Sequence, residues 1–517
     1  MSHFTWLDYL LFIVYLLASV AVGAVFVKEQ KTTKDYFLAG RSMGYIVVAI
    51  SVIAALFSGI TYLGAPSEVY AHDISFALVS LAFFIATPVA TLIFLPLYYQ
   101  SRFYTAYQYL EERFSLGVRT LASALFIIRV LLWLGLATYA PALALQQVTG
   151  LPLWFTIVST AVLTTFYTTL GGMKAVIWTD VMQFGVLFGG QIIIFAVALS
   201  RIPGGIGGAY QLGLEGDKFT LDFSFDPTVR VTLWGLILGG AFMHLVQMVT
   251  DQVSVQRYYT ASSLKEAQRS LWLKLACVLP VAAVFYLSGV VLYAFYKVHG
   301  DPIAAKAIPK ADYILPYFVI TELPMGMPGL LISAIYAASM STISAGINAL
   351  TTATLVDFYD RLWRGDHGFE QRVTLARIWT VIYGLVVLAL AFVVQRLGTL
   401  LEASNKAIGL VGGPMIGLFL LGMVTRRAND KGAIIGWAAG FAALIPICFY
   451  TTVSFLWYAL VGCVVTFAVG YAGSLLFARP QEQQLHGLTI MDPPAEDGTS
   501  TKGGGIEEGK NGEEGLS

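Results

Sequence analysis

One stretch of the sequence, Ile335 to Asp357, has the length and apolarity of a membrane-spanning helix, yet it carries side chains that can bind a cation. Hydroxyl and amide groups recur along it, at Ser339, Ser341, Thr342, Ser344 and Asn348. Three of the hydroxyls fall within one helical turn. Closely spaced uncharged oxygens suit a hard cation such as sodium. Small and hydroxyl residues also line ordinary contacts between membrane helices, so an ion site and a packing surface both remain open.

The composition is that of a membrane protein. Of the 517 residues, 57% are hydrophobic and 12% are charged, and the mean hydropathy is +0.73. Apolar runs of about twenty residues recur along nearly the whole chain, which is the length that crosses a bilayer as a helix. The formal net charge is +0, so nothing indicates a nucleic-acid partner. The three cysteines lie in apolar runs without metal-ligand spacing, and we interpret them as buried thiols: Cys277, Cys448 and Cys463.

We predict an all-α polytopic membrane protein with about thirteen transmembrane helices. The spans are expected near 6–27, 44–65, 75–99, 118–148, 153–170, 175–200, 229–250, 270–297, 327–357, 373–395, 400–424, 432–450 and 454–477. Basic residues concentrate in alternate loops, which predicts an outside N-terminus and a cytoplasmic C-terminus in the plasma (inner) membrane. Residues 1–478 would form the transporter domain. Residues 479–517, which end in a polar low-complexity run, would form a disordered cytoplasmic tail.

Two blocks of five spans can be set against each other, at about 44–200 and 229–424. Because five is odd, the second block enters the membrane from the opposite side, as in an inverted repeat. The first span of each block is rich in glycine, in FSGITYLGAPSEVY at 57–70 and WGLILGGAFMHLVQMVTDQ at 234–252. Interrupted helices at matching positions indicate a binding site near the middle of the membrane. Close helix packing is the alternative for each glycine cluster.

Ionisable side chains inside predicted spans are costly and commonly functional. Arg129 lies about eleven residues into its span, hence ~16 Å deep at 1.5 Å per residue. Asp180 and Asp251 lie near span ends, and His244 stands alone in its span. Arg129 is expected to pair with a carboxylate such as Asp251, with carbonyls freed by a broken helix, or with the carboxylate of a bound substrate. A lone membrane histidine is more often a hydrogen-bonded interior residue than a ligand.

Several motifs resemble those of the sodium/solute symporter family. They are GGMKAVIWTDVMQ at 171–183, DQVSVQRY at 251–258, MST at 340–342 and GLVGGPMIGLFLLGMVTRRAN at 409–429. The motifs LGAPSEVY at 63–70, YLEERFS at 109–115 and YAPALALQQVTG at 139–150 are similar to the branch of sodium-coupled iodide, monocarboxylate and multivitamin transporters. The resemblance runs from about Leu7 to Phe477. It implies leucine-transporter-type inverted five-helix repeats, and uptake coupled to sodium by alternating access.

The resemblance also implies site residues. The main sodium site would take backbone carbonyls from Ala54, Phe57 and Ala338 and hydroxyls from Ser341 and Thr342. A second sodium site, present in some members, would use Ser58, Thr61, Ser341, Ser344 and Asp180. Here Ala345 stands where some of those members carry another hydroxyl. The substrate candidates are Thr61, Arg129, His244 and Asp251.

We therefore predict a sodium-coupled secondary symporter that imports a small solute, with an organic anion such as a monocarboxylate as the favoured substrate class. Its partners would be the solute, Na⁺ as the co-transported ion, and the lipid bilayer. A carrier of a neutral solute (sugar, amino acid or vitamin) and a membrane sensor on the same helices are the alternatives. A membrane enzyme is disfavoured because the sequence shows no cluster of catalytic or metal-binding residues.

Overall fold

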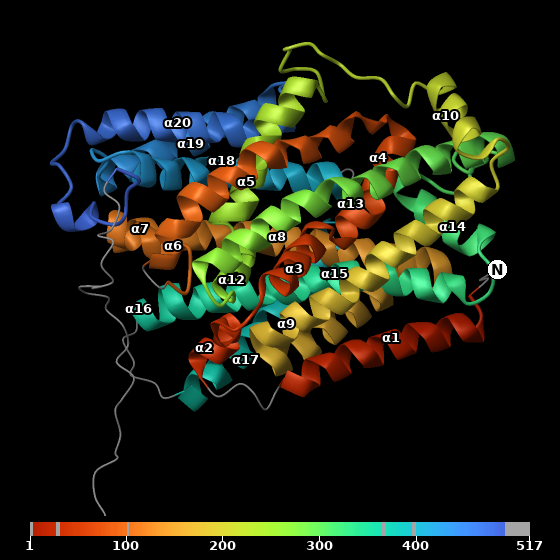
Figure 1. Cartoon of the computed structure of the whole chain (residues 1–517), viewed down its shortest axis with the longest axis horizontal. Helices are drawn as coiled ribbons and strands as arrows, with labels where there is room; N and C mark the ends of the chain where they lie inside the picture. Colours follow the sequence, from red (N-terminus) through yellow and green to blue (C-terminus); the bar gives the residue numbers. More distant parts are fainter. Residues whose placement is uncertain (1–3, 27–31, 101–102, 363–368, 395–399, 492–517) are drawn as a thin grey trace, which may run out of the picture.

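The computed structural model describes residues 4–26, 32–100, 103–362, 369–394 and 400–491. Over these residues the chain forms helices and no strand. Most of the long helices lie along one common direction, horizontal in Figure 1. Within the described residues, nine helices are long and apolar enough to cross a membrane, and up to 11 if each of two bent pairs counts as one span. The prediction of an all-helical polytopic protein is confirmed.

The helices follow the predicted spans. Their bounds are α1 Trp6–Val25, α2 Thr33–Leu38, α3 Tyr45–Leu56, α4 Gly59–Ala71, α5 Phe83–Val89, α6 Leu95–Gln100, α7 Tyr107–Arg113, α8 Leu116–Thr149, α9 Leu153–Ser200, α10 Gly205–Glu215, α11 Gly240–Leu245, α12 Gln252–Tyr259, α13 Leu264–His299, α14 Ile314–Glu322, α15 Met327–Ala353, α16 Asp360–Leu362, α17 Phe369–Val394, α18 Leu400–Val424, α19 Asp430–Tyr450 and α20 Tyr458–Ser474. Helix α9 is interrupted at Gly172, whose φ of 57° and ψ of −167° are open to glycine alone. The break falls between the predicted spans 153–170 and 175–200.

Two helices are broken where the glycine-rich segments predicted it. Helices α3 and α4 meet at an angle of 56°, and Gly235–Thr250 meets α12 at 54°. The first break leaves α3 capped by Phe57, with Ser58 extended before α4 begins. Gly59 then approaches α15 closely, because a Cβ atom placed on it would lie 1.9 Å from the Ser339 hydroxyl oxygen. Glycine is therefore required here for the close helix contact, whereas the break itself falls at Phe57 and Ser58, whose φ angles are negative.

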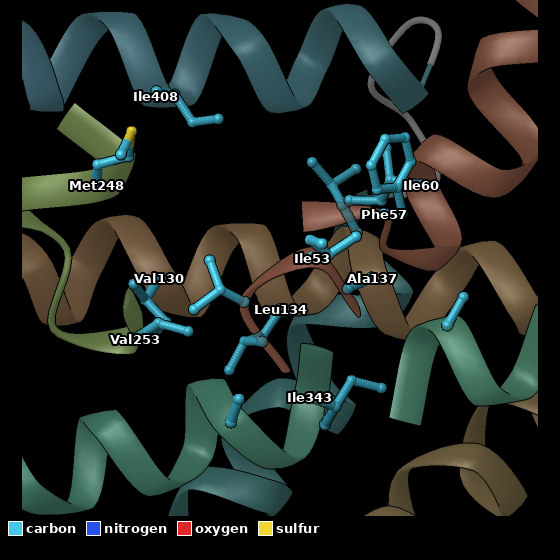
Figure 2. Close-up of a cluster of buried hydrophobic side chains, with 14 of the residues drawn as sticks. Ile53, Phe57, Ile60, Val130, Leu134, Ala137, Met248, Val253, Ile343 and Ile408 are labelled. Atoms are coloured by element: carbon cyan, nitrogen blue, oxygen red, sulfur yellow. The ribbon is translucent and has the colours of Figure 1, made fainter. Parts of the chain in front are cut away.

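Helix α15 is the central helix of the bundle. In its apolar segment 94% of the residues are buried, against 22% for α1 at the periphery. It contacts α1, α3, α4, α8, α9 and α17. Figure 2 shows the apolar side chains around its middle, among them Ile53, Leu134 and Ile343. A helix that is surrounded by protein has no need to be apolar on every face, so its hydroxyls do not face lipid.

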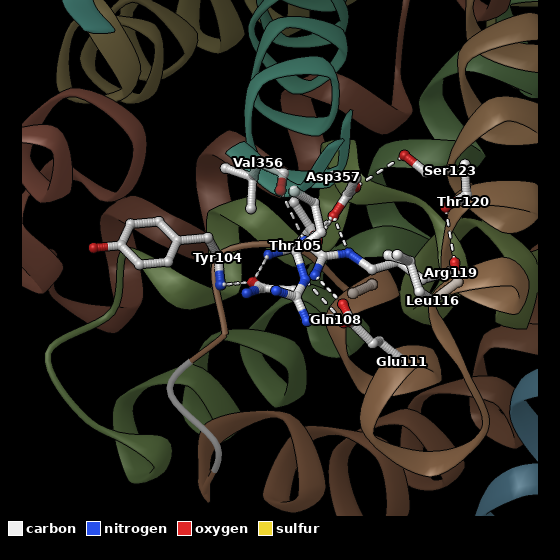
Figure 3. Close-up of polar contacts among 12 residues, drawn as sticks. Tyr104, Thr105, Gln108, Glu111, Leu116, Arg119, Thr120, Ser123, Val356 and Asp357 are labelled. Carbon is white, nitrogen blue, oxygen red and sulfur yellow. Dashed lines mark hydrogen bonds and ion pairs between the residues drawn. The ribbon is translucent and has the colours of Figure 1, made fainter. Parts of the chain in front are cut away.

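The continuation of α15 is held to α8 by a buried ion pair (Figure 3). Asp357, in the π-helical turn Thr354–Tyr359, is 0% exposed. It accepts hydrogen bonds from Arg119 Nε at 2.8 Å, Thr105 Oγ1 at 2.7 Å and Ser123 Oγ at 2.9 Å. Arg119 also donates to Glu111 at 2.5 Å. Every oxygen of Asp357 thus has a donor, as a carboxylate this deeply buried requires.

Glu111 lies outside the membrane-spanning helices, in α7. Partial burial would raise the pKa of its carboxyl, but hydrogen bonds from Arg361 and Arg119 outweigh this and lower the pKa below the usual glutamate value. Glu111 therefore stays ionised and links the α7–α8 connection to Arg361, beyond the end of α15.

The segment after α20 corrects one expectation. Residues 479–491 do not behave as part of a disordered tail, because Leu485, Leu488 and Thr489 are buried. Tyr109 donates to the Leu488 carbonyl at 2.9 Å, and the Ile490 amide donates to the Met423 carbonyl at 2.9 Å. The polar low-complexity end of the predicted tail, at 492–517, lies outside the described residues.

The prediction that all three cysteines are buried thiols also needs correction, because Cys463 is buried whereas Cys277 and Cys448 are partly exposed.

The ion pair of Asp357 should contribute strongly to stability. We expect Asp357→Asn to lower the free energy of unfolding by about 3–5 kcal/mol, because it removes the fully buried counter-charge of Arg119 and leaves the partly exposed Glu111 as its remaining carboxylate. Thermal unfolding of the purified protein in detergent measures the effect. Arg269→Ala is the matched control, because it breaks an exposed pair with Glu266 and should cost at most about 1 kcal/mol. Equal losses in the two variants would contradict the assignment.

The contact of Gly59 with α15 gives a second prediction. We expect Gly59→Ala to lower the melting temperature, because the new methyl group must displace the Ser339 hydroxyl. Gly59→Ala combined with Ser339→Ala should recover part of the loss. Gly185→Ala, in α9, is the control because no atom outside its own helix lies within 4 Å of the added methyl group. A melting temperature that is unchanged by Gly59→Ala would refute the close approach.

Candidate ion and substrate site

The break between α3 and α4 leaves backbone carbonyls at the end of α3 that could bind a cation. The last carbonyls of a helix have no donor from a following turn, and they carry the negative end of the helix dipole. Ala54 and Phe57 belong to this last turn and its cap, and they are 1% and 3% exposed. Thr61 Oγ1 donates to the Leu56 carbonyl at 3.3 Å. Backbone oxygens at a buried helix end require some other electropositive partner.

The hydroxyl-bearing part of α15 lies next to this break, because Gly59 at the start of α4 packs directly against Ser339 of α15. Ser341 is 1% exposed, and within the described residues its Oγ has no hydrogen-bond partner. Thr342 Oγ1 donates to the Ala338 carbonyl at 3.1 Å, and Ser344 Oγ to the Ser341 carbonyl at 3.1 Å. Since a hydroxyl donates only one hydrogen, the oxygen lone pairs of both remain able to accept a cation.

Asn348 has a different role from the hydroxyls. Its Oδ1 accepts a hydrogen bond from Gln256 Nε2 at 2.8 Å, and the same Gln256 nitrogen lies 3.1 Å from Thr352 Oγ1. These contacts tie α15 to α12. The packing alternative therefore holds for Asn348, whereas Ser341 turns its hydroxyl toward the carboxylate of Asp180.

Asp180 lies behind the α15 hydroxyls, in the second half of α9. It is 0% exposed, and its Oδ2 accepts from Ser51 at 2.5 Å and from Arg257 at 2.9 Å. The Ser341 hydroxyl lies beside this carboxylate. The residues expected for a main and a second cation site are thus contributed by α3, α4, α9 and α15, four elements that meet at the break.

A cavity of about 140 Å³ adjoins the break. All four substrate candidates line it: Thr61, Arg129, His244 and Asp251. Its other walls are mainly apolar, and they include Phe76, Phe83, Trp133, Met248 and Ile408. A small, apolar cavity with a few converging polar groups is typical of a site for a small molecule.

The two charged candidates bind each other. Arg129 Nη2 lies 2.6 Å from Asp251 Oδ2, and the side chains are only 3% and 7% exposed. Asp251 Oδ1 also accepts from the Val253 amide at 3.0 Å, which caps the start of α12. Of the pairings expected for Arg129, the structure shows the one with Asp251.

His244 is a hydrogen-bonded interior residue at the cavity wall. Its Nε2 lies 3.1 Å from the Val79 carbonyl oxygen, and its ring stacks on Phe83 with centroids 3.6 Å apart. The interaction with Val79 agrees with the expectation that a lone histidine in a membrane span is a hydrogen-bonded interior residue.

Lys274 is the cavity residue that sequence reasoning missed. It lines the cavity from α13, is 2% exposed, and places Nζ 3.9 Å from the centroid of the Phe83 ring. No carboxylate in the described part of the chain forms an ion pair with it. Its signal in the sequence was a lysine inside the predicted span 270–297, four residues from the start of that span.

Comparison with known proteins agrees with this geometry. The sequence profile of the sodium:solute symporter family matches residues 36–440. The chain is 38% identical over 451 residues to sodium-coupled monocarboxylate transporter 1 of Xenopus laevis, covering 85% of this chain and 71% of the relative. It is 35% identical over 446 residues to the sodium-dependent multivitamin transporter of Oryctolagus cuniculus, covering 85% and 70%.

Solved structures give the same result. A Na⁺-coupled sialic acid symporter, in a substrate-bound outward-open state, matches with a TM-score of 0.84 and 30% identity, over 92% of this chain and 99% of that one. Mhp1, a nucleobase-cation-symport-1 family transporter, matches with a TM-score of 0.57 at 16% identity, over 88% and 97%, which supports the fold alone. From these matches, the chain belongs to the sodium:solute symporter family, as an integral membrane protein with Na⁺ as its co-transported ion.

Proposed function

We propose that this protein imports a small organic anion, such as a monocarboxylate, together with sodium by alternating access and without chemical conversion. The observation that carries the anionic substrate is Lys274, a buried amine in the cavity wall that forms no ion pair with a carboxylate in the described part of the chain. Relatives that are named as sodium-coupled monocarboxylate transporters add support.

The charge balance of the cavity favours a monoanion. Arg129 and Asp251 neutralise each other at 2.6 Å, so Lys274, when protonated, has no counter-charge among the described residues. A buried charge without a counter-charge is unfavourable, and a bound carboxylate would supply one. We therefore assign the substrate carboxylate to Lys274. The carboxylate of Asp251 keeps Arg129 engaged, while Thr61 and His244 line the same cavity.

The size of the cavity favours a small solute. A protein cavity of about 150 Å³ holds a benzene molecule, and the cavity here is about 140 Å³. A short monocarboxylate fits that volume. A sugar or a vitamin would require a wider cavity than this conformation offers, so its size favours a monocarboxylate over these two solutes.

We propose that the main sodium site lies between α3 and α15. The carbonyls of Ala54, Phe57 and Ala338 and the hydroxyls of Ser341 and Thr342 would surround the ion. The buried helix end and the buried Ser341 hydroxyl, which lies beside the Asp180 carboxylate, support this placement. A second ion would lie among Ser58, Thr61, Ser344 and Asp180, where the carboxylate would offset its charge.

We further propose thirteen spans in two inverted repeats, at about 44–200 and 229–424. Two shorter apolar helices, Leu153–Phe166 and Ile408–Val424, together with the nine long helices and the two bent pairs, support that number. The bias of basic residues supports an outside N-terminus and a cytoplasmic C-terminus in the plasma membrane.

The sodium site can be tested by removing its hydroxyls one at a time. We expect Ser341→Ala and Thr342→Ala each to raise the sodium concentration for half-maximal uptake at least about tenfold, because a charge-assisted contact is worth ~1.5–3 kcal/mol. Surface expression should stay near that of the unchanged protein. Uptake of a labelled monocarboxylate into proteoliposomes at graded sodium concentrations gives the result. An unaltered sodium dependence in both variants would disprove the site.

The substrate assignment predicts a loss of selectivity when the charge of Lys274 is removed. We expect Lys274→Met to raise the concentration of pyruvate, lactate or butyrate for half-maximal uptake at least about tenfold. It should also abolish the preference for butyrate over butyramide. The melting-temperature increase caused by sodium alone should survive. Lys265→Met, on the exposed side of the same helix, is the control. A variant that still prefers the carboxylate over the amide would overturn the assignment.

A further inference from the structure

Asp180 has two oxygens in different surroundings. Its Oδ2 accepts hydrogen bonds from Ser51 Oγ at 2.5 Å and from Arg257 Nη2 at 2.9 Å. Its Oδ1 is buried and has no hydrogen-bond partner within the described residues. A buried carboxylate oxygen without a donor is unusual and requires a partner. The hydroxyl of Ser341, a proposed sodium ligand, interacts with the same carboxylate.

Arg257 is fully engaged on the other side of the carboxylate. It is 1% exposed, and besides Asp180 it donates from Nε to Ser51 Oγ at 2.8 Å and from Nη1 to the Val253 carbonyl at 2.7 Å. One guanidinium group therefore joins α3, α9 and α12. Ser51 precedes Ala54 by less than one turn of α3, so Arg257 holds the half-helix whose end provides the proposed sodium carbonyls.

We propose that Arg257 and bound sodium share the carboxylate of Asp180, one at each oxygen, and that Arg257 thereby lowers the affinity of the site for sodium. This inference rests on the proposed sodium site. Two cations on one carboxylate repel each other, and inside a protein such repulsion is worth several-fold to a hundredfold in affinity at an effective dielectric constant of ~20. Arg257 acts through Asp180, so it is a positioning residue. A site weakened in this way releases sodium more readily once the transport cycle has opened it to the low-sodium side.

The charge of Arg257 can be separated from its geometry by two substitutions. Arg257→Gln removes the charge, and it should lower the sodium concentration at the midpoint of binding by about tenfold. Arg257→Lys keeps a charge but loses the planar fork, so its midpoint should stay within about twofold of the unchanged protein. If Arg257→Gln only damaged the structure, sodium binding would weaken and the midpoint concentration would rise.

The experiment measures sodium binding without transport. The melting temperature of the purified full-length protein is followed while sodium replaces potassium at constant ionic strength, since an ion that binds only the folded state raises that temperature. Arg119→Gln is the matched control, because Arg119 is an equally buried arginine on another buried carboxylate, Asp357. It should lower stability and leave the sodium midpoint unchanged. Asp180→Asn should raise the midpoint.

Each outcome decides the inference. A lower midpoint in Arg257→Gln, with an unchanged one in Arg257→Lys, supports it. An unchanged or higher midpoint in Arg257→Gln overturns it, even if Ser341→Ala and Thr342→Ala confirm the sodium site. If Arg257→Gln does not fold, Arg257→Lys still decides, because a midpoint shifted more than about fivefold shows that geometry and not charge is what matters. If Ser341→Ala and Thr342→Ala leave the midpoint unchanged, the proposed sodium site itself fails.

Discussion

The structure depends on the requirement that backbone groups inside a membrane find partners within the protein. A continuous helix meets that requirement by itself, and a broken one does not. The chain interrupts helices at only a few places in its described spans, and the α3–α4 break lies against α15, the most buried helix of the bundle. The orphan carbonyls are thereby kept from lipid. The same burial makes them available to a desolvated cation, so the cost of the break and the function of the site have one physical origin.

Charges within the spans obey a similar requirement. Arg119 meets Asp357, Arg129 meets Asp251, and Arg257 meets Asp180, each at less than 3 Å. Each pair joins elements that are distant in the sequence. A buried pair adds little net stability compared with apolar residues of the same volume, but it fixes which helices lie together. Lys274 differs from these arginines because no carboxylate in the described part of the chain pairs with it, and this difference is the basis for assigning the substrate carboxylate to Lys274 in the proposed function.

The sequence was sufficient to predict the spans and the two broken helices, because apolar length and clustered glycines are local signals. It also predicted that the Ile335–Asp357 stretch is central, since hydroxyls in an apolar run must face protein. The partner of Arg129 was named only as one of several possibilities. The two residues are 122 positions apart, and the sequence alone does not show which distant residues the fold brings into contact. Lys274 was missed because a lysine near a helix end can reach water, and the sequence does not show that this one points into a cavity. The docking of 479–491 was missed for a similar reason, since its few apolar residues become buried only against α7 and α18.

The two sides of the proposed site also differ in how they bind. On the α15 side the ligands are neutral hydroxyls, which attract sodium weakly and release it without leaving a charge behind. On the α9 side a full carboxylate attracts sodium strongly, but its negative charge is already partly neutralised by Arg257. An ion that must be both captured and released in each cycle needs intermediate affinity, because tight binding in every state would stop turnover. A carboxylate divided between an arginine and an ion provides that intermediate affinity. It does so within a single hydrogen-bonded group that also positions α3, so the strength of ion binding and the position of the broken helix are set by the same contacts.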